Sequence, residues 1–191
     1  MNTTRRQLLQ AASAALIAEP VLALPGEPPL DAIPALPAKP TPGKAGDFDF
    51  LTGEWKIRNW RLPAGATAWD QFDGEATVHR ILGGVGSVEE LRIPARGFAG
   101  MGLRLLDVQK GVWIDHWVNA KNGLLTPPGL PGSFEQGTGL FWSDETENGK
   151  TTRFVSLWDR ITPTTCRWRQ ASSEDGGRTW AHNWLMEWRR A

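Results

Sequence analysis

FDFLTGEWKIRNWRL, residues 48–62, decides the fold of this 191-residue chain. It contains a short helical turn, then Gly53, then a strand that opens with Trp55. About nine further strand-like segments follow, and the domain has no long segment with the apolar period of a helix. The sequence therefore predicts a small antiparallel β-barrel preceded by a helical turn.

Apolar and polar side chains alternate with period two through the whole domain, and turn residues interrupt them roughly every 8–15 residues. The predicted strands span residues 55–62, 69–82, 87–93, 100–108, 112–119, 123–126, 137–143, 151–161, 164–172 and 178–190. Short consecutive strands joined by hairpins indicate an all-β, up-and-down barrel of about ten strands, because closure removes the exposed sheet edges. The glycines at 83–86 fit one of these hairpins, since no helix pattern follows them as it would after a phosphate-binding loop.

Residues 1–23 are predicted to be an export signal peptide. Arg5 and Arg6 precede an uncharged run that ends at Ala18 and is too short to span a bilayer, which takes roughly 20 apolar residues. The arginine pair followed by two leucines resembles a twin-arginine signal, and an ordinary Sec signal is the alternative. We expect cleavage after Ala23 and a periplasmic or secreted mature protein, with the export machinery as the partner of residues 1–23.

Residues 24–45 hold seven of the fourteen prolines and are predicted to be a stiff, polyproline-like tether outside the core. The remaining residues, 46–191, suit one domain with a single core. Without residues 1–23 the chain has 19 basic and 20 acidic residues, and this charge of −1 argues against a nucleic-acid or anionic-membrane partner. Cys166 is the only cysteine, so we expect no internal disulfide and no lipid anchor near the cleavage point.

Two features near the C-terminus support the barrel. Residues 173–180, SEDGGRTW, match the Asp-box pattern, in which Asp175 bonds the backbone of its own turn and Trp180 packs beneath it. In the last strand, alternate residues are predicted to share the face that points into the barrel: Trp180, His182, Trp184, Met186, Trp188 and Arg190.

Gly53, Trp55 and Arg190 resemble the closing motif of the calycins, a family that includes the lipocalins and the fatty-acid-binding proteins. In that family the tryptophan of Gly-x-Trp closes one end of the barrel, and an arginine of the last strand packs over its ring. The resemblance gives this structural role to Trp55 and Arg190, with Arg189 as the other candidate. A closer resemblance, to a bacterial family of uncharacterised calycin-like proteins, rests on FDFLTGEW, ILGGVGSVEE, GMGLRLLD, VWIDHWVNAKNGLLTPPGLPGSFEQGTGLFW and SEDGGRTWAHNWLMEW, and implies the fold without an activity.

The strand at 112–119 offers a candidate wall for a ligand. Trp113, Asp115, Trp117 and Asn119 share one of its faces, and two indoles beside a carboxylate and an amide supply flat surfaces with a few oriented hydrogen bonds. The alternative is that the aliphatic face of this strand points inward and the polar, aromatic face lies against a loop.

Charged residues could add polar contacts. Glu90, Arg92 and Arg104 lie on neighbouring predicted strands, and they must pair with one another or with a ligand if they enter the lumen. Otherwise they are solvated surface charges. His182, among the tryptophans of the last strand, is a further candidate contact. Cys166 has no evident base nearby, so nucleophilic catalysis lacks support.

These patterns favour an exported, non-enzymatic barrel that binds a small, partly apolar molecule. One alternative is an enzyme that uses Glu90, Arg104 or His182 for acid–base chemistry. Another is a haem protein, because a haem-binding calycin branch, the nitrobindins, takes its iron ligand from a late histidine, which here would be His182. No cofactor is otherwise expected, and no histidine has a second ligand at metal-binding spacing.

Overall fold

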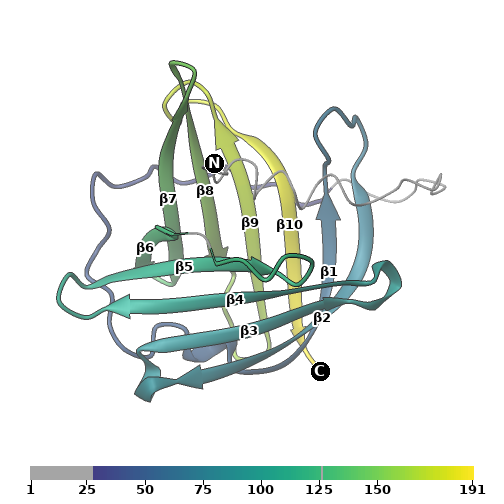
Figure 1. Cartoon of the computed structure of the whole chain (residues 1–191), viewed down its shortest axis with the longest axis vertical. Helices are drawn as coiled ribbons and strands as arrows, with labels where there is room; N and C mark the ends of the chain where they lie inside the picture. Colours follow the sequence, from purple (N-terminus) through teal and green to yellow (C-terminus); the bar gives the residue numbers. More distant parts are fainter. Residues whose placement is uncertain (1–27, 126) are drawn as a thin grey trace.

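The computed structural model describes residues 28–125 and 127–191, and they form a closed antiparallel barrel in up-and-down order, as the sequence predicts (Figure 1). The elements are η1 (Asp49–Leu51), β1 (Gly53–Arg61), β2 (Asp70–Ile81), η2 (Leu82–Gly84), β3 (Gly86–Ile93), η3 (Pro94–Arg96), β4 (Phe98–Asp107), β5 (Val112–Asn119), β6 (Leu130–Glu135), β7 (Thr138–Glu147), β8 (Lys150–Asp159), β9 (Thr165–Ser173) and β10 (Ala181–Arg190). None of the helices in these ranges is long and apolar enough to cross a membrane. The signal peptide predicted at residues 1–23 lies outside the described residues.

The first and last strands pair with each other and so close the sheet. Trp55 of β1 lies opposite Arg190 of β10, and Arg61 lies opposite Trp184. All other neighbours in the ring are consecutive in the sequence. In Figure 1, β3–β5 cross β7–β10 at a steep angle, so these two groups of strands form facing walls of the barrel.

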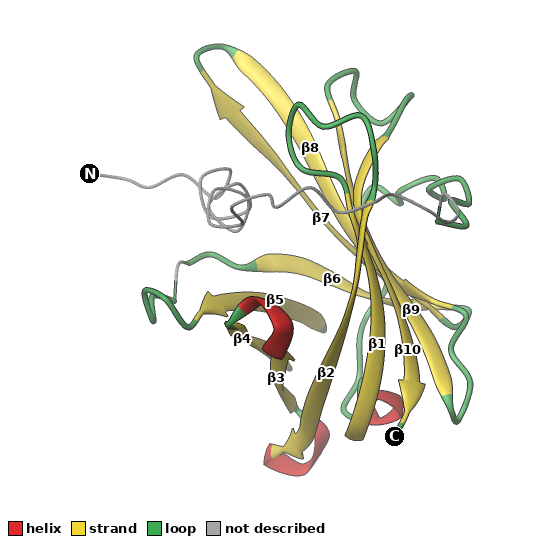
Figure 2. Ribbon diagram, turned by 90° about the vertical axis from the view of Figure 1, so that its right-hand side faces the viewer, coloured by secondary structure: helices red, strands yellow, loops and turns green. Residues whose placement is uncertain are grey.

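An aromatic floor fills the end of the barrel where η1 lies, and Figure 2 shows a short helix at this end beside the C-terminus. Alternate residues of each strand point inward, and near η1 these positions carry large rings. The indole N–H of Trp55 donates to the carbonyl oxygen of Leu51 at 2.7 Å, which ties the first strand to the turn before it. The buried residues of the floor include Phe48, Leu51, Trp55, Trp113, Phe141, Trp158 and Trp188.

Arg190 joins the last strand to this floor. Its guanidinium lies over the ring of Trp55, 4.4 Å from the ring centroid, and donates to the carbonyl oxygens of Phe50, at 2.9 Å, and of Thr52. Carbonyl groups at the end of a short helical turn have no partner in the helix, so these donors satisfy them. The contact predicted from the Gly-x-Trp motif is confirmed, with Arg190 and not Arg189 as the arginine.

The Asp-box turn lies between β9 and β10. Asp175 accepts hydrogen bonds from the backbone N–H groups of Arg178, at 2.9 Å, and of Thr179, at 3.0 Å. The pKa of Asp175 is held below its ordinary value by these bonds and by hydrogen bonds from neighbouring side chains. The backbone N–H of Thr179 is the largest cause. The ring of Trp180 packs against Gly177 of the same turn. The turn thus has the internal bonding that the motif predicts.

The sixth strand differs from the prediction. The sequence indicates a strand at residues 123–126, whereas β6 begins at Leu130, after two prolines. Its register with β5 covers three pairs, one of which places Pro131 opposite Ile114. A proline has no N–H to donate to a ladder, which favours such a short pairing.

Residues 28–45, which we call the strap, are the described part of the proline-rich segment, and they lie against the outside of the barrel. The N–H of Gly43 donates to the carbonyl oxygen of Gly111 in the β4–β5 turn at 2.7 Å. Toward the other end, the carbonyl oxygen of Pro29 accepts a 2.9 Å bond from Arg167 of β9. The strap is therefore bound to the wall at two separate places.

Replacement of Gly53 by alanine tests the floor. Gly53 has φ +123°, and an added Cβ would lie 2.4 Å from Nη1 of Arg190. We expect Gly53→Ala to lower the free energy of unfolding by about 3 kcal/mol, because backbone strain adds to displacement of the guanidinium. Denaturant unfolding measures this change.

Gly65→Ala is the matched control, since Gly65 also has a positive φ, +81°, but nothing lies within 4 Å of an added Cβ. It should cost about 1 kcal/mol from backbone strain alone. Equal losses in the two variants would show that Arg190 does not constrain this position.

Candidate ligand-binding site in the barrel lumen

Two aromatic pairs face the lumen above the floor. Phe98 of β4 and Trp117 of β5 are stacked, with ring centroids 6.3 Å apart and an interplanar angle of 12°. Trp168 of β9 and Trp184 of β10 meet edge to face, with centroids 6.1 Å apart. All four side chains are half-buried, unlike the rings of the floor. The two pairs lie on opposite walls, because β5 and β10, like β4 and β9, are five places apart in the ring of strands.

A glycine makes room for one of these rings. A Cβ added at Gly100 of β4 would lie 2.2 Å from the ring of Trp117, so the indole rests directly on the backbone there. Glycine within a strand often marks such a close approach. Gly100 therefore allows the indole of Trp117 to lie directly against the backbone of β4.

Polar side chains surround the ring of Trp184. Its N–H donates to Oδ1 of Asn59 at 3.1 Å, and the guanidinium of Arg61 lies 5.0 Å from its ring centroid. Burial lowers the pKa of Arg61 from its ordinary value. Nearby, Arg96 forms a bidentate ion pair with Asp70, with N–O distances of 2.5 and 2.7 Å. This part of the lumen therefore combines aromatic surfaces with cationic and amide groups.

A buried ion pair lies deeper in the lumen. Nη2 of Arg104 donates to Oε2 of Glu89, and Nε of Arg104 lies 3.6 Å from Oδ1 of Asp115. Gly102 leaves the space for this pair, since an added Cβ would lie 3.0 Å from Arg104 and 3.2 Å from Glu89. Burial acts to lower the pKa of Arg104, but the two carboxylates outweigh it and raise the pKa, so the guanidinium stays charged.

Cys166 lies near this ion pair. Burial raises the pKa of its thiol above the ordinary range, and the negative charge of Glu89 adds to the effect. A thiol that does not ionise is a poor nucleophile. The structure therefore gives Cys166 a packing role.

Several buried hydrogen-bond donors at inward-facing positions have no hydrogen-bond partner among the described residues. They are Nδ2 of Asn59, Oγ of Ser87, Nε and Nη1 of Arg104, Oγ of Ser156, and the indole Nε1 atoms of Trp158 and Trp188. An unmet buried donor costs about 1–3 kcal/mol, and native proteins normally satisfy such groups. Acceptors from buried water or from a bound molecule would satisfy these groups.

The structure places the polar and aromatic face of β5 inward, as one of the two predicted arrangements requires. Asp115, Trp117 and Asn119 pair with Arg104, Gly102 and Gly100 of β4, which face the lumen. Trp113 faces inward too, but it is buried in the floor and donates to Oδ2 of Asp47 at 3.1 Å. Asn119 accepts a bond from the N–H of Lys121 at the end of its strand.

Glu90 does not reach the lumen. It lies on the outer face of β3, where it accepts a 2.8 Å bond from Arg92. Its neighbour Glu89 is the inward carboxylate that pairs with Arg104. The prediction of a lumen contact by Glu90 is corrected to Glu89, because Glu89 shares the buried face with Leu91.

His182 also lies outside the lumen. A β-bulge between His182 and Trp184 shifts the register, so that His182 pairs with Ala171 while Trp184 pairs with Gln170. Because adjacent residues of β9 point to opposite faces, His182 faces outward. Burial and the neighbouring Arg169 lower its pKa to about 4. The expected contact with a lumen ligand or haem iron is thus not formed.

Sequence reasoning missed several lumen residues, among them Asn59, Ser156 and Trp168. Each follows the period-two pattern of its strand, so a complete assignment of faces would have included them. Within the described ranges no group of three or more His, Cys, Asp or Glu side chains could hold a metal ion. A shallow groove on the outer wall over β10, β1 and β2 is solvent-open and charged, and it lies apart from the lumen.

No protein-family profile matches the sequence, and no curated protein matches it. Twelve chains among the solved structures match the fold. One is a protein of unknown function from the DUF3598 family of Nostoc punctiforme, with a TM-score of 0.42 and 14% identity over 82% of this chain. This chain spans 53% of the length of that protein. The calycin resemblance remains a prediction.

Replacing one member of the buried charged group should destabilise the barrel more than replacing all three. Glu89→Leu leaves Arg104 without its closest carboxylate and should lower the free energy of unfolding by about 3–5 kcal/mol. Combining it with Arg104→Met and Asp115→Asn removes every charge of the group and should recover at least about half of that loss. Denaturant unfolding of the single and the triple variant measures these changes.

Glu75→Leu, at an ion pair with Lys56 on the outer wall (N–O distance 2.8 Å), is the control and should cost no more than about 1 kcal/mol. A triple variant as unstable as Glu89→Leu, or less stable, would contradict a coupled charged group.

His182 should contribute to the loss of stability in acid. Its pKa, about 4 in the folded protein, lies below the ordinary 6.5, so the unfolded chain takes up the proton first. Stability should therefore fall as the pH drops from about 6.5 to 4, and His182→Gln should show a smaller fall in Tm over that range. His79→Gln, at an exposed outer position, is the control and should follow the wild type. Parallel curves for all three proteins would contradict a buried, uncharged His182.

Proposed function

We propose that the barrel is a binding protein for a small, flat, partly apolar molecule that carries carbonyl-type acceptors. The proposal rests on the two half-buried aromatic pairs on opposite walls, together with the buried donors of Asn59 and Ser156, which have no partner among the described residues. Aromatic walls with a few oriented polar groups are typical of small-molecule sites. In the exported protein that residues 1–23 predict, the molecule would be bound in the periplasm or outside the cell.

The two aromatic pairs would hold the body of the ligand. Trp117 is backed by Gly100, and Trp184 is fixed by its bond to Asn59, so both rings are oriented before a ligand arrives. A ligand bound to rings that are already ordered loses less conformational entropy. Opposed flat surfaces favour a planar ring system over a flexible chain.

The buried donors would select the polar group. Asn59 and Ser156 are neutral and buried, and each brings a donor without a partner among the described residues. The deeper charges, Glu89 and Asp115 against Arg104, give one negative charge more than positive. A neutral carbonyl therefore suits this depth better than a carboxylate.

Fluorescent probes test the proposal. Prodan, a flat naphthyl ketone, should bind the wild-type protein with a blue-shifted emission and quench tryptophan fluorescence. Trp184→Leu should weaken prodan binding about tenfold, because one aromatic surface is worth about 1–1.5 kcal/mol. Trp142→Leu, at a half-buried position on the outer face of β7, is the matched control and should change the affinity less than about twofold.

A second comparison tests the acceptor. Ser156→Ala should weaken prodan binding but leave binding of N-phenyl-naphthylamine, which has no carbonyl group, within about twofold, because it removes a donor without touching Trp184. Failure of both probes to bind the folded wild type, or equal losses in the Trp184 and Trp142 variants, would refute a ligand site in the lumen. Native mass spectrometry of protein purified from its own cells would then identify the natural ligand by mass.

A further inference from the structure

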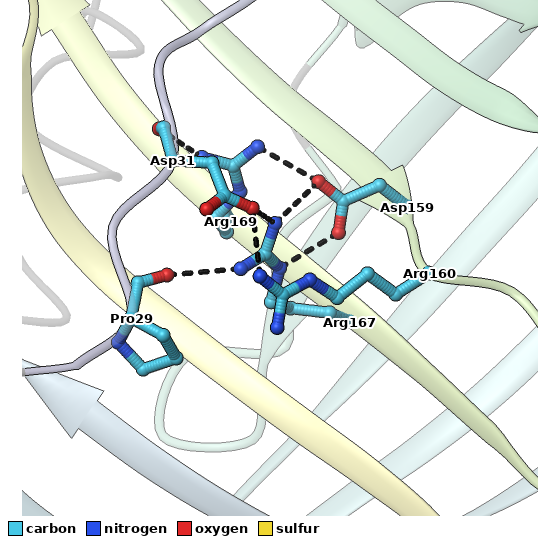
Figure 3. Close-up of polar contacts among 6 residues, drawn as sticks. All are labelled: Pro29, Asp31, Asp159, Arg160, Arg167 and Arg169. Atoms are coloured by element: carbon cyan, nitrogen blue, oxygen red, sulfur yellow. Dashed lines mark hydrogen bonds and ion pairs between the residues drawn. The ribbon is translucent and has the colours of Figure 1, made fainter.

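The outer wall of the barrel carries a second polar cluster, on the face of β9 that points away from the lumen. Arg167 and Arg169 occupy alternate outer positions of β9, and both are only 2% exposed although they face away from the lumen. Asp159, at the end of β8, binds both of them: Arg167 through Nε at 2.7 Å and Nη2 at 2.8 Å, and Arg169 through Nη2 at 2.7 Å. The carboxylate of Asp159 thus accepts hydrogen bonds from two buried guanidinium groups (Figure 3).

The second carboxylate comes from the strap. Oδ2 of Asp31 accepts bonds from Arg167 at 2.5 Å and from Arg160 at 2.9 Å. A buried guanidinium needs a counter-charge and acceptors for its donors, and the wall alone supplies only part of them. Accordingly, the hydrogen bond from Arg167 holds the pKa of Asp31 below its ordinary value.

The backbone of the strap also accepts hydrogen bonds from the wall. The carbonyl oxygen of Pro29 accepts from Nη1 of Arg167 at 2.9 Å, and that of Asp31 accepts from Nη1 of Arg169 at 2.5 Å. Figure 3 shows both carbonyls and the carboxylate turned toward the two arginines. Pro28 and Pro29 favour an extended backbone with its carbonyl groups free of internal bonds. Three acceptors within three residues therefore match the donors of the wall.

We propose that this part of the wall, formed by Asp159, Arg160, Arg167 and Arg169, is a docking site for an extended, proline-rich acidic peptide. Its occupant is the chain's own segment at residues 28–34, PPLDAIP. Because the segment belongs to the same chain, its effective concentration at the site is on the order of millimolar. Docking in cis therefore excludes a free peptide of the same sequence unless the strap is displaced.

Charge reversal in the full-length chain tests the docking site. Asp31→Lys places a cation against three arginines and should release the strap. Elastase should then cleave after Ala32, Ala35 or Ala38 at least about tenfold faster than in the wild type, as located by intact mass. Asp73→Lys is the matched control, since Asp73 is exposed on the outer wall at 3.8 Å from a single arginine, Arg58. It should leave strap cleavage unchanged.

Binding in trans tests the same site without proteolysis. A labelled peptide PPLDAIP should bind the Asp31→Lys protein at least about tenfold more tightly than the wild type, where the site is filled. The peptide with asparagine in place of the aspartate should bind that variant at least about tenfold more weakly. Thermal unfolding of each variant confirms that its barrel is folded.

Three results would overturn the proposal. The strap of the Asp31→Lys protein could remain as protected as in the wild type, or the peptide could bind neither protein. A wild-type dimer that dissociates on this substitution would show that the site receives the strap of a second copy instead of its own.

Discussion

The barrel depends on the way in which Arg190 binds the turn before the first strand. Closure must bring together strands from the two ends of the domain, and no short connection helps them to meet. Arg190 joins the last strand to the start of the first. It donates hydrogen bonds to the carbonyl oxygens of Phe50 and Thr52, and its guanidinium plane covers the ring of Trp55. The same contact closes one end of the cylinder.

The side chains inside the barrel differ between its two ends: they are aromatic and fully buried near η1, and more polar and half-buried farther from it. Near η1 the inward positions carry rings, and the space is filled by Phe48, Trp113 and their neighbours. Farther along the strands, glycines at 100 and 102 alternate with large side chains, so the wall has room both for an indole and for a buried ion pair. This alternation of small and large residues gives the upper lumen its shape.

Local sequence predicted most of the fold, because turn glycines and period-two alternation act within a few residues. The local sequence predicted β1, the contact of Trp55 with Arg190, and the number of strands, which is ten. The predicted assignment of side chains to the inner or outer face of a strand was wrong in two places. His182 has the same spacing as the inward tryptophans, and only pairing with β9 reveals the bulge. In SVEELRI, the apolar Val88 shares a face with Glu90, which hides Glu89 as the inward carboxylate. The strap site could not be found at all, because Asp31 and Arg167 meet across 136 residues of sequence.

The buried position of Cys166 has a consequence for handling and for the cell. Its side chain is packed in the core, and burial raises the pKa of the thiol, with the charge of Glu89 adding to the effect. An inaccessible, protonated thiol forms neither a mixed disulfide with glutathione nor a crosslink to a second folded molecule. A covalent dimer on a non-reducing gel would then report unfolding of the barrel and not an association of native molecules.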